Sequence, residues 1–173
     1  MEEFVKKFIF LIIFSIALIN LNGLEKISLV EKESEIINKL LNDFHLAASK
    51  ANESEYMGYL SEDSIFMGTA SEEIWTKEQF RKYTHPYFSK GRGWTYIPKD
   101  RHLKFSENKR IAWFYEKLLN ERYGTLRGSG VLRKEGNGEW KIVQYNMVFT
   151  IPNDVAKKVV EIIQKTTNKT SGI

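Results

Sequence analysis

The chain contains no cysteine, only three prolines and only three histidines among its 173 residues. Because it has no thiol, it cannot form a disulfide, a thiolate zinc site, an iron-sulfur cluster or a cysteine nucleophile. His45, His85 and His102 are far apart and show no HExxH-type spacing, so we expect neither a metal nor a cofactor. What is present, 42% hydrophobic and 28% charged residues, is typical of one compact globular domain.

One apolar run, residues 8–21, lies near the N-terminus directly after two lysines. At about 1.5 Å per residue, a helix of this length is shorter than the ~30 Å hydrocarbon core of a membrane. We therefore expect residues 1–23 to be a signal peptide and the mature protein to be periplasmic or secreted. Two glutamates before the lysines and a poor cleavage sequence at Gly23 favour a second interpretation, in which residues 8–21 are retained as a membrane anchor.

Helical patterns follow this run. A capping-box pattern at Ser28 precedes a long stretch with apolar residues at helical spacing. A second capping box pairs Thr76 with Gln79, and we expect His85-Pro86 to kink or end the helix that it starts. The predicted elements of this half are helices over 29–51 and 53–60, a short strand over 64–68, and a helix from 76 that stops before Gly91.

From Trp94 onward the pattern changes to strands separated by short turns. We predict strands over 94–105, 110–119, 124–134 and 139–151, and their short connections predict antiparallel neighbours. A terminal helix with Val155, Val159, Ile162 and Ile163 follows, before a tail over 166–173 that we expect to be mobile. Helices followed by a meander of strands predict one α+β domain over 28–165, in which a curved antiparallel sheet wraps the helices.

The two central hairpins predict which polar residues share a face of the sheet. A four-residue loop, 120–123, places Glu116 opposite Arg127. A turn at Gly136-Asn137 then places Arg127 opposite Asn146, and a turn at Asn137-Gly138 shifts the pairing by two but keeps the same faces. We therefore predict a polar cluster, ringed by apolar side chains such as Phe114 and typical of a ligand pocket, made of Glu116, Arg127, Gln144 and Asn146.

The same residues also fit structural roles. Glu116 and Arg127 would then be an ordinary cross-strand pair worth ~0.2 to 1 kcal/mol, and the two amides would satisfy backbone groups. His45, on the first predicted helix, is either a pocket residue or a hydrogen-bonded core histidine. Both faces of the predicted sheet are largely apolar and each needs cover, so we expect a homodimer through one face of the sheet.

Residues 81–110 are strongly basic, with nine lysines and arginines against Asp100 and Glu107. They are spread over a helix end and a hairpin, and no nucleic-acid-binding motif accompanies them. We expect a solvated basic face, or contact with anionic surfaces, and no nucleic-acid partner. Contact with a membrane is expected only if the N-terminal run is retained.

Several short motifs resemble one family in their order and spacing. They are Phe66-Met67-Gly68-Thr69, Trp75-Thr76-Lys77-Glu78-Gln79-Phe80, Pro86-Tyr87-Phe88, Gly91-Arg92-Gly93-Trp94, Ala112-Trp113-Phe114-Tyr115-Glu116, Arg127-Gly128-Ser129-Gly130-Val131 and Trp140-Lys141-Ile142-Val143-Gln144-Tyr145-Asn146. Over about residues 32–155 the chain is similar to the SnoaL-like branch of the nuclear transport factor 2 superfamily. The resemblance implies a cone-shaped α+β barrel with a pocket between the helices and the concave sheet, commonly dimeric through the sheet. It transfers no catalytic residue, because the superfamily includes isomerases, dehydratases, cyclases and epoxide hydrolases as well as domains without catalysis.

Three functions are consistent with these features. The first is an exported, noncatalytic domain that binds an unidentified small molecule, with candidate pocket residues Glu116, Arg127, Gln144, Asn146, His45, Tyr56 and Phe114. The second is an enzyme of the isomerase, dehydratase or cyclase type, in which Glu116 or His45 is the general base, Arg127 stabilises negative charge, and Tyr56 or Tyr145 donates a hydrogen bond. The third is an assembly module that dimerises through its sheet and binds no ligand.

Overall fold

The computed structural model describes residues 1, 3 and 29–170 of the chain. The apolar run at 8–21 and the predicted cap at Ser28 lie outside these residues. No helix within the described ranges is long and apolar enough to cross a membrane. The signal-peptide and anchor interpretations therefore both remain predictions.

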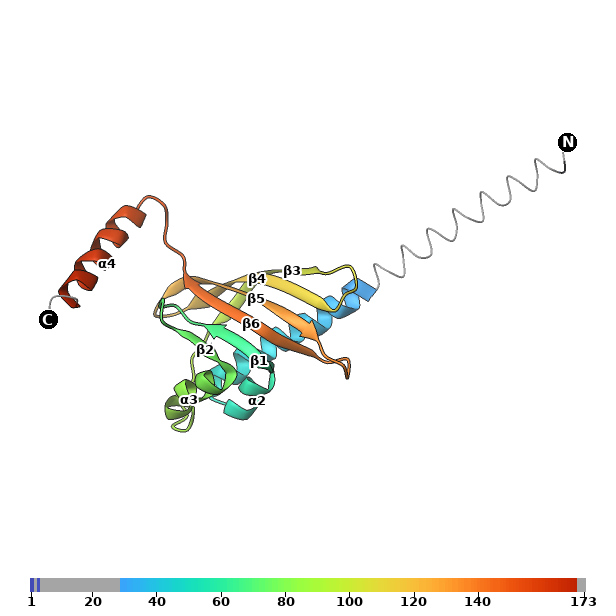
Figure 1. The fold of residues 1–173 in the computed structure, drawn as a ribbon, viewed down its shortest axis with the longest axis horizontal. Coiled ribbons are helices and arrows are strands. Elements are labelled where there is room, and N and C mark those ends of the chain that lie inside the picture. Colours follow the sequence, from blue (N-terminus) through green and yellow to red (C-terminus); the bar gives the residue numbers. More distant parts are fainter. Residues whose placement is uncertain (2, 4–28, 171–173) are drawn as a thin grey trace.

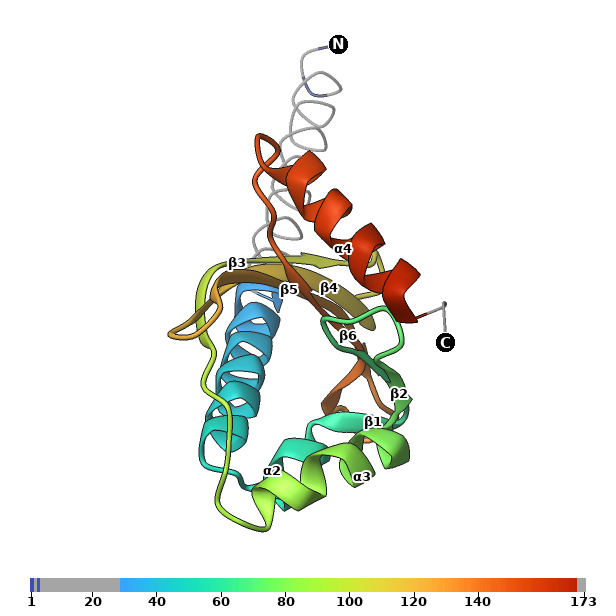
Figure 2. The ribbon, with the colours of Figure 1, turned by 90° about the vertical axis from the view of Figure 1, so that its left-hand side faces the viewer.

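The described chain is an α+β domain, as the sequence predicts. Its elements are a helix covering 29–49, α2 (Glu53–Gly58), β1 (Leu60–Met67), β2 (Ile74–Thr76), α3 (Lys77–Phe88), β3 (Ile97–Phe105), β4 (Ile111–Asn120), β5 (Gly124–Lys134), β6 (Trp140–Phe149) and α4 (Ala156–Thr170). The strands form one six-stranded sheet in the order β2-β1-β6-β5-β4-β3. All neighbours are antiparallel except β1 and β6, which are parallel. The sheet curves over the helix of residues 29–49, and α2 and α3 lie near the C-terminal end of this helix (Figure 2).

The helices form where the spacing of apolar residues and the capping residues predict them. Ile37, Leu41 and Phe44 are almost completely buried on the inner face of the first helix. The predicted capping box of α3 is confirmed: the Thr76 hydroxyl accepts from the Gln79 amide, and the Gln79 side chain accepts from the Thr76 amide. Pro86 lies inside α3, and the helix continues to Phe88. A proline so close to the end of a helix removes few further hydrogen bonds, so it does not break α3.

The first two strands depart most from the prediction. β1 begins at Leu60, four residues before the predicted strand, and β2 was not predicted. The first half of β1 is polar and shows no apolar run, and its partner in the sheet is the distant β6. Strand pairing between such distant segments is a tertiary effect that local periodicity does not report.

The predicted register between β4 and β5 is wrong by one residue. Asn120 pairs with Gly124, so Glu116 lies opposite Gly128 and Lys117 lies opposite Arg127. The loop has three residues instead of four, because Gly124 adopts a left-handed φ of 70° and can pair directly with Asn120. A shift of one residue moves a side chain to the other face of the sheet, so Glu116 and Arg127 project to opposite sides.

The β5–β6 pairing matches neither predicted turn along its whole length. Ser129 pairs with Asn146 and Val131 with Gln144, the register predicted for a turn at Asn137-Gly138, but beside the turn Lys134 pairs with Trp140, one residue off that register. A bulge after Val131 then shifts the pairing by one residue. Because of this bulge, Ile142 and Tyr145 both lie on the inner face of the sheet, although they are three positions apart along β6. Both residues are fully buried.

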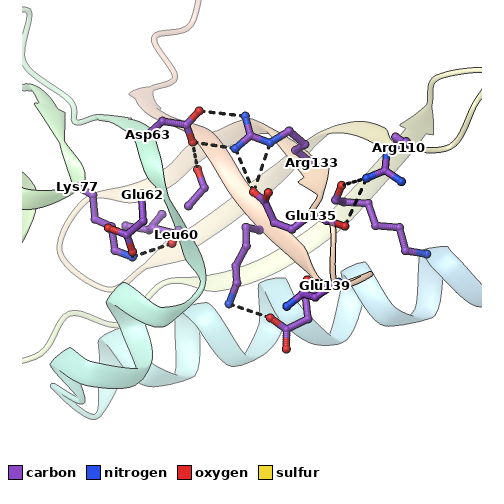
Figure 3. Close-up of polar contacts among 12 residues, drawn as sticks. Leu60, Glu62, Asp63, Lys77, Arg110, Arg133, Glu135 and Glu139 are labelled. Atoms are coloured by element: carbon purple, nitrogen blue, oxygen red, sulfur yellow. Dashed lines mark hydrogen bonds and ion pairs between the residues drawn. The ribbon is translucent and has the colours of Figure 1, made fainter.

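Ion pairs on the outer surface connect strands that are not neighbours. Arg133 on β5 donates from Nη1 and Nη2 to the two carboxylate oxygens of Asp63 on β1, at 3.0 and 2.9 Å, and also bonds Glu135 (Figure 3). Hydrogen bonding and the charge of the Arg133 guanidinium hold the pKa of the Asp63 carboxyl below its usual range. The pair spans β6, which lies between β1 and β5 in the sheet.

The C-terminal helix α4 stands apart from the sheet at the end of the segment after β6 (Figure 1). Val160, Ile162 and Ile163 are each about half exposed along it. The helix extends to Thr170, whereas the sequence predicts a tail from residue 166. Among the described residues, the compact domain is therefore formed by 29–149.

Candidate functional site

Glu116 is the centre of a buried polar cluster on the inner face of β4. The residue is 1% exposed, and its carboxylate faces groups from three other elements. The His45 Nε2 atom lies 2.9 Å from Oε1, and the Tyr145 hydroxyl donates to the same oxygen at 3.2 Å. Arg101 donates from Nε to Oε2 at 2.8 Å, and its Nη2 atom lies 2.7 Å from that oxygen. We call these four residues the Glu116 cluster.

A bulge in β3 brings Arg101 into this cluster. Lys99 pairs with Lys117 and His102 with Tyr115, so two residues of β3 oppose the single residue Glu116. The first of the two, Asp100, has a left-handed φ of 47°. This extra residue turns the Arg101 side chain inward, where it is only 8% exposed.

Two residues of the first helix also bond Arg101. The Nη1 atom of Arg101 donates to the Asn38 carbonyl at 3.0 Å and to the Asn42 side-chain oxygen at 2.9 Å. The guanidinium therefore connects β3, β4 and the helix. Sequence reasoning counted Arg101 only among the basic residues of 81–110, because nothing in strand spacing signals a bulge.

His45 and Tyr145 occupy the other side of the carboxylate. His45 is 5% exposed and follows Phe44 on the first helix, so the structure places it as a hydrogen-bonded core histidine, one of the two roles considered. Tyr145 comes from β6, and Gly128 on β5 leaves room for its hydroxyl. A Cβ atom at Gly128 would lie 2.6 Å from the Tyr145 oxygen and 3.1 Å from Glu116 Oε1.

The electrostatics of the cluster keep Glu116 ionised. Burial opposes its ionisation, but the hydrogen bond and charge of His45 and the charge of Arg101 outweigh burial and hold its pKa below the ordinary value. Burial and the Glu116 charge raise the pKa of the Tyr145 hydroxyl well above its usual value, so this hydroxyl stays a donor. A fully buried carboxylate with a lowered pKa and both oxygens occupied is a structural anion and a poor general base.

The remaining predicted pocket residues do not join Glu116. Arg127, Gln144 and Asn146 lie on the outer face of the sheet, where the first two are exposed and Asn146 is partly exposed. The predicted four-residue polar pocket is therefore wrong, and the one-residue register shift is the cause.

Tyr56 and Phe114 are core residues. Tyr56 is 2% exposed and stacks on Phe44 with ring centroids 4.4 Å apart. Phe114 is 3% exposed and packs against Tyr145 at 5.9 Å. Neither is free to contact a solute in this conformation.

A hollow of about 570 Å³ lies over the β3 bulge, among Tyr115, Lys117 and Arg127. Glu116 borders it, but the Glu116 side chain has no exposed area, so only its backbone can contribute there. Lys117 is already paired with Asp100 at 2.8 Å. This hollow therefore gives no access to the carboxylate.

A second cavity, of about 270 Å³, has a different character and was not predicted as a site. It lies among β1, β2, α3, the segment that leads into β3, and the end of β6. We call it the aromatic pocket, because eight of its twelve lining residues carry rings. The lining residues are Phe66, Gly68, Thr69, Glu73, Trp75, Phe80, Tyr83, Trp94, Tyr96, Tyr123, Met147 and Phe149.

Stacked rings build the walls of the aromatic pocket. Phe66 stacks on Phe80 with centroids 3.8 Å apart, and Trp75 stacks on Tyr83 at 4.5 Å. Such pairs add to the free energy gained from burial and fix the ring orientations. The pocket is thus a preformed recess, walled largely by aromatic rings and partly open to solvent.

Glu73 is the charged member of this lining. Its Oε2 atom accepts hydrogen bonds from the backbone amides of Thr69 at 2.8 Å and Ala70 at 3.1 Å, so the carboxylate is fixed by the β1–β2 loop. Gly68 permits this approach, since a Cβ atom there would lie 2.3 Å from that oxygen. Burial is the largest cause that raises the pKa of both Tyr83 and Tyr96; for Tyr83 the Glu73 charge comes next, and for Tyr96 neighbouring tyrosines come before Glu73, so both phenols are neutral donors.

Sequence reasoning missed this pocket although it singled out several of its residues as family motifs. Phe66, Trp75, Phe80 and Trp94 come from separate segments that meet only in the folded sheet. No periodicity within one segment connects them. Within the described ranges, no three histidine or acidic side chains are grouped so that they could hold a metal ion.

The fold is shared with known structures. A nuclear transport factor 2-like protein of unknown function from Pseudomonas putida aligns with a TM-score of 0.60 and 12% identity over 73% of this chain and 92% of its own. A ketosteroid isomerase-like protein from Erwinia carotovora gives a TM-score of 0.52 and 16% identity over 68% and 96%. A cystatin-like-fold protein of unknown function from Nostoc punctiforme gives 0.56 and 18% over 68% and 90%. These likenesses define the nuclear transport factor 2-like class of fold.

Sequence assigns the family within that class. The family described as SnoaL-like domain matches residues 37–152, and the chain belongs to it. This confirms the resemblance inferred from the motifs. No curated protein matches the sequence.

Proposed function

We propose that this SnoaL-like domain binds a small, largely apolar molecule in the aromatic pocket and does not catalyse a reaction. The observation that carries the proposal is the pocket itself: about 270 Å³ of space walled by eight aromatic residues and open to solvent. Ligand sites in proteins are mostly apolar recesses with a few fixed polar groups, and Glu73, Tyr83 and Tyr96 supply such groups here. The proposed site is therefore the aromatic pocket and not the predicted pocket around Glu116.

The geometry gives no support to an enzyme based on Glu116 or His45. Both side chains are buried and bonded to each other, and no substrate atom can reach them in this conformation. Arg127, the group expected to stabilise negative charge, lies on the outer face of the sheet. Glu73 has one oxygen engaged by two backbone amides, which suits a fixed polar group better than a mobile base.

Isothermal titration calorimetry with 1-naphthol and indole tests the proposal. Both probes are small, planar and apolar, and we expect saturable binding to the wild-type chain. Trp75→Leu removes a ring from the pocket wall and should weaken binding about tenfold, as the loss of one aromatic contact of about 1.4 kcal/mol requires.

Trp113→Leu is the matched control. It removes the same side chain from the outer face of β4, where Trp113 is 47% exposed and is not one of the residues that line the pocket. This variant should bind both probes like the wild type. Absence of saturable binding, or equal losses in the two variants, would contradict the proposal.

Export and assembly are separate proposals. The apolar run at 8–21 supports export with signal cleavage, which N-terminal sequencing of the mature protein would test. Exposed Trp113 and Tyr115 on the outer sheet face support a homodimer through that face. Sedimentation equilibrium of Trp113→Lys beside the wild type would test it: the wild type should be a dimer and the variant a monomer.

A further inference from the structure

The charge of the aromatic pocket is opposite in sign to that of the whole chain. The sequence carries 26 lysines and arginines against 22 aspartates and glutamates, a net charge of +4. Yet the pocket lining contains no lysine, arginine or histidine, and its one ionisable carboxylate is Glu73. An anionic group in an otherwise uncharged recess attracts a positive ligand.

The rings that surround Glu73 reinforce this preference. The faces of Trp and Tyr rings are negative because of their quadrupoles, and they attract organic cations within about 6 Å. Trp75, Trp94, Tyr83, Tyr96 and Tyr123 all line the pocket. An ammonium group is held best when several such faces and a carboxylate surround it, because the cation then loses its water without losing electrostatic contacts.

The carboxylate is held in place before any ligand arrives. Its Oε2 atom is fixed by the amides of Thr69 and Ala70, and Gly68 gives it room. A site arranged in advance loses less conformational entropy on binding.

We propose that the ligand of the aromatic pocket is an organic cation, a quaternary or protonated amine that carries a compact apolar group. This inference rests on the proposed ligand-binding function and adds the charge of the ligand. The apolar group would pack on Phe66 and Phe80, and the ammonium would lie among Glu73, the tyrosines and the tryptophans.

Three probes of the same shape and different charge test the proposal on the full chain. They are phenyltrimethylammonium, its uncharged isostere tert-butylbenzene, and the anion benzenesulfonate. We expect calorimetry to show that the cation binds about tenfold more tightly than the uncharged isostere, and that the anion does not bind detectably. A chain of net charge +4 would by itself favour the anion, so a preference for the cation must come from the pocket.

Two variants separate the pocket charge from the net charge. Glu73→Gln keeps an oxygen for the amides of Thr69 and Ala70 but removes the charge, and should lower affinity for the cation about tenfold without changing that for tert-butylbenzene. Glu72→Gln removes the same charge from the same loop, but Glu72 is exposed and bonds Ser71 outside the pocket lining. It should bind the cation like the wild type.

The outcomes distinguish this inference from the function on which it rests. If tert-butylbenzene binds as tightly as phenyltrimethylammonium, the ligand-binding function stands and the cation preference is overturned. If Glu73→Gln and Glu72→Gln lose affinity equally, long-range charge explains the effect and the inference also fails. If none of the three probes binds, the proposed function itself is wrong.

Discussion

Replacing Glu116 by leucine tests how much the buried Glu116 cluster contributes to the stability of the domain. Leucine is similar in size to glutamate and carries no charge, so the change removes the anion and leaves little empty space. Arg101, with its side chain 8% exposed, would keep its bonds to Asn38 and Asn42 but lose its counter-charge. Loss of one partner of a buried ion pair costs roughly 3 to 5 kcal/mol.

That cost is large for a domain of this size. Single domains have free energies of unfolding of about 5–15 kcal/mol, so Glu116→Leu should shift the urea midpoint strongly downward. The matched control is Arg127→Leu, which changes the residue that the sequence predicted as the partner of Glu116. Arg127 is exposed on the outer face, so this variant should stay within about 0.5 kcal/mol of the wild type.

A double variant completes the test. Glu116→Leu with Arg101→Met removes both charges and should recover part of the stability lost by Glu116→Leu alone, because no unpaired ion is left buried. Urea unfolding followed by far-ultraviolet circular dichroism gives the free energies of the wild type, Arg127→Leu, the double variant and the two single variants Glu116→Leu and Arg101→Met. The reasoning is refuted if Arg127→Leu costs as much as Glu116→Leu, or if the two losses of Glu116→Leu and Arg101→Met simply add.

Three further predictions concern other parts of the domain. Folding lowers the pKa of Glu116, so the contribution of its ionisation to stability is complete above about pH 4.3 and is lost as the pH falls through the lowered pKa of the folded state. In urea titrations, the difference in unfolding free energy between the wild type and Glu116→Gln should therefore narrow below pH ~4.3. Gly128→Ala should cost about 1–3 kcal/mol, because its Cβ would lie 2.6 Å from the Tyr145 hydroxyl, whereas Gly136→Ala, with no atom within 4 Å of the new Cβ, should stay within about 0.5 kcal/mol in the same assay. Deleting residues 154–173, which removes α4, should leave the thermal midpoint of the domain almost unchanged by calorimetry; a fall of more than about 8 °C would show that α4 is part of the folded unit.

Local signals in the sequence were sufficient to predict most of the helices and strands of this fold. The capping box at Thr76 and the apolar spacing of the first helix act within one or two turns, so the sequence reports them directly. The order of helices and strands then restricts the architecture to an α+β domain, and short turns restrict the pairing of the last four strands. These parts of the prediction agree with the structure.

The candidate site could not be predicted with equal success, because it depends on single-residue details of the backbone. A left-handed φ at Gly124 shortens one loop by a residue, and an extra residue at Asp100 bulges β3. Each of these two features places the side chains of a strand on the face opposite to the predicted or regular one, so Arg127 faces outward and Arg101 faces inward. Neither event changes the hydrophobic pattern, since both faces of this sheet are rich in apolar residues.

The Glu116 cluster and the aromatic pocket are connected through one side chain. Tyr145 donates its hydroxyl to Glu116, and its ring stacks on Phe66 with centroids 5.3 Å apart. Phe66 in turn lines the pocket and stacks on Phe80. A buried anion that holds the tyrosine hydroxyl therefore also fixes the ring against which the inner pocket wall packs. The buried charges therefore position the side chains behind the inner wall of the pocket, whereas Glu73 and the outer rings are the groups that the proposed ligand would contact.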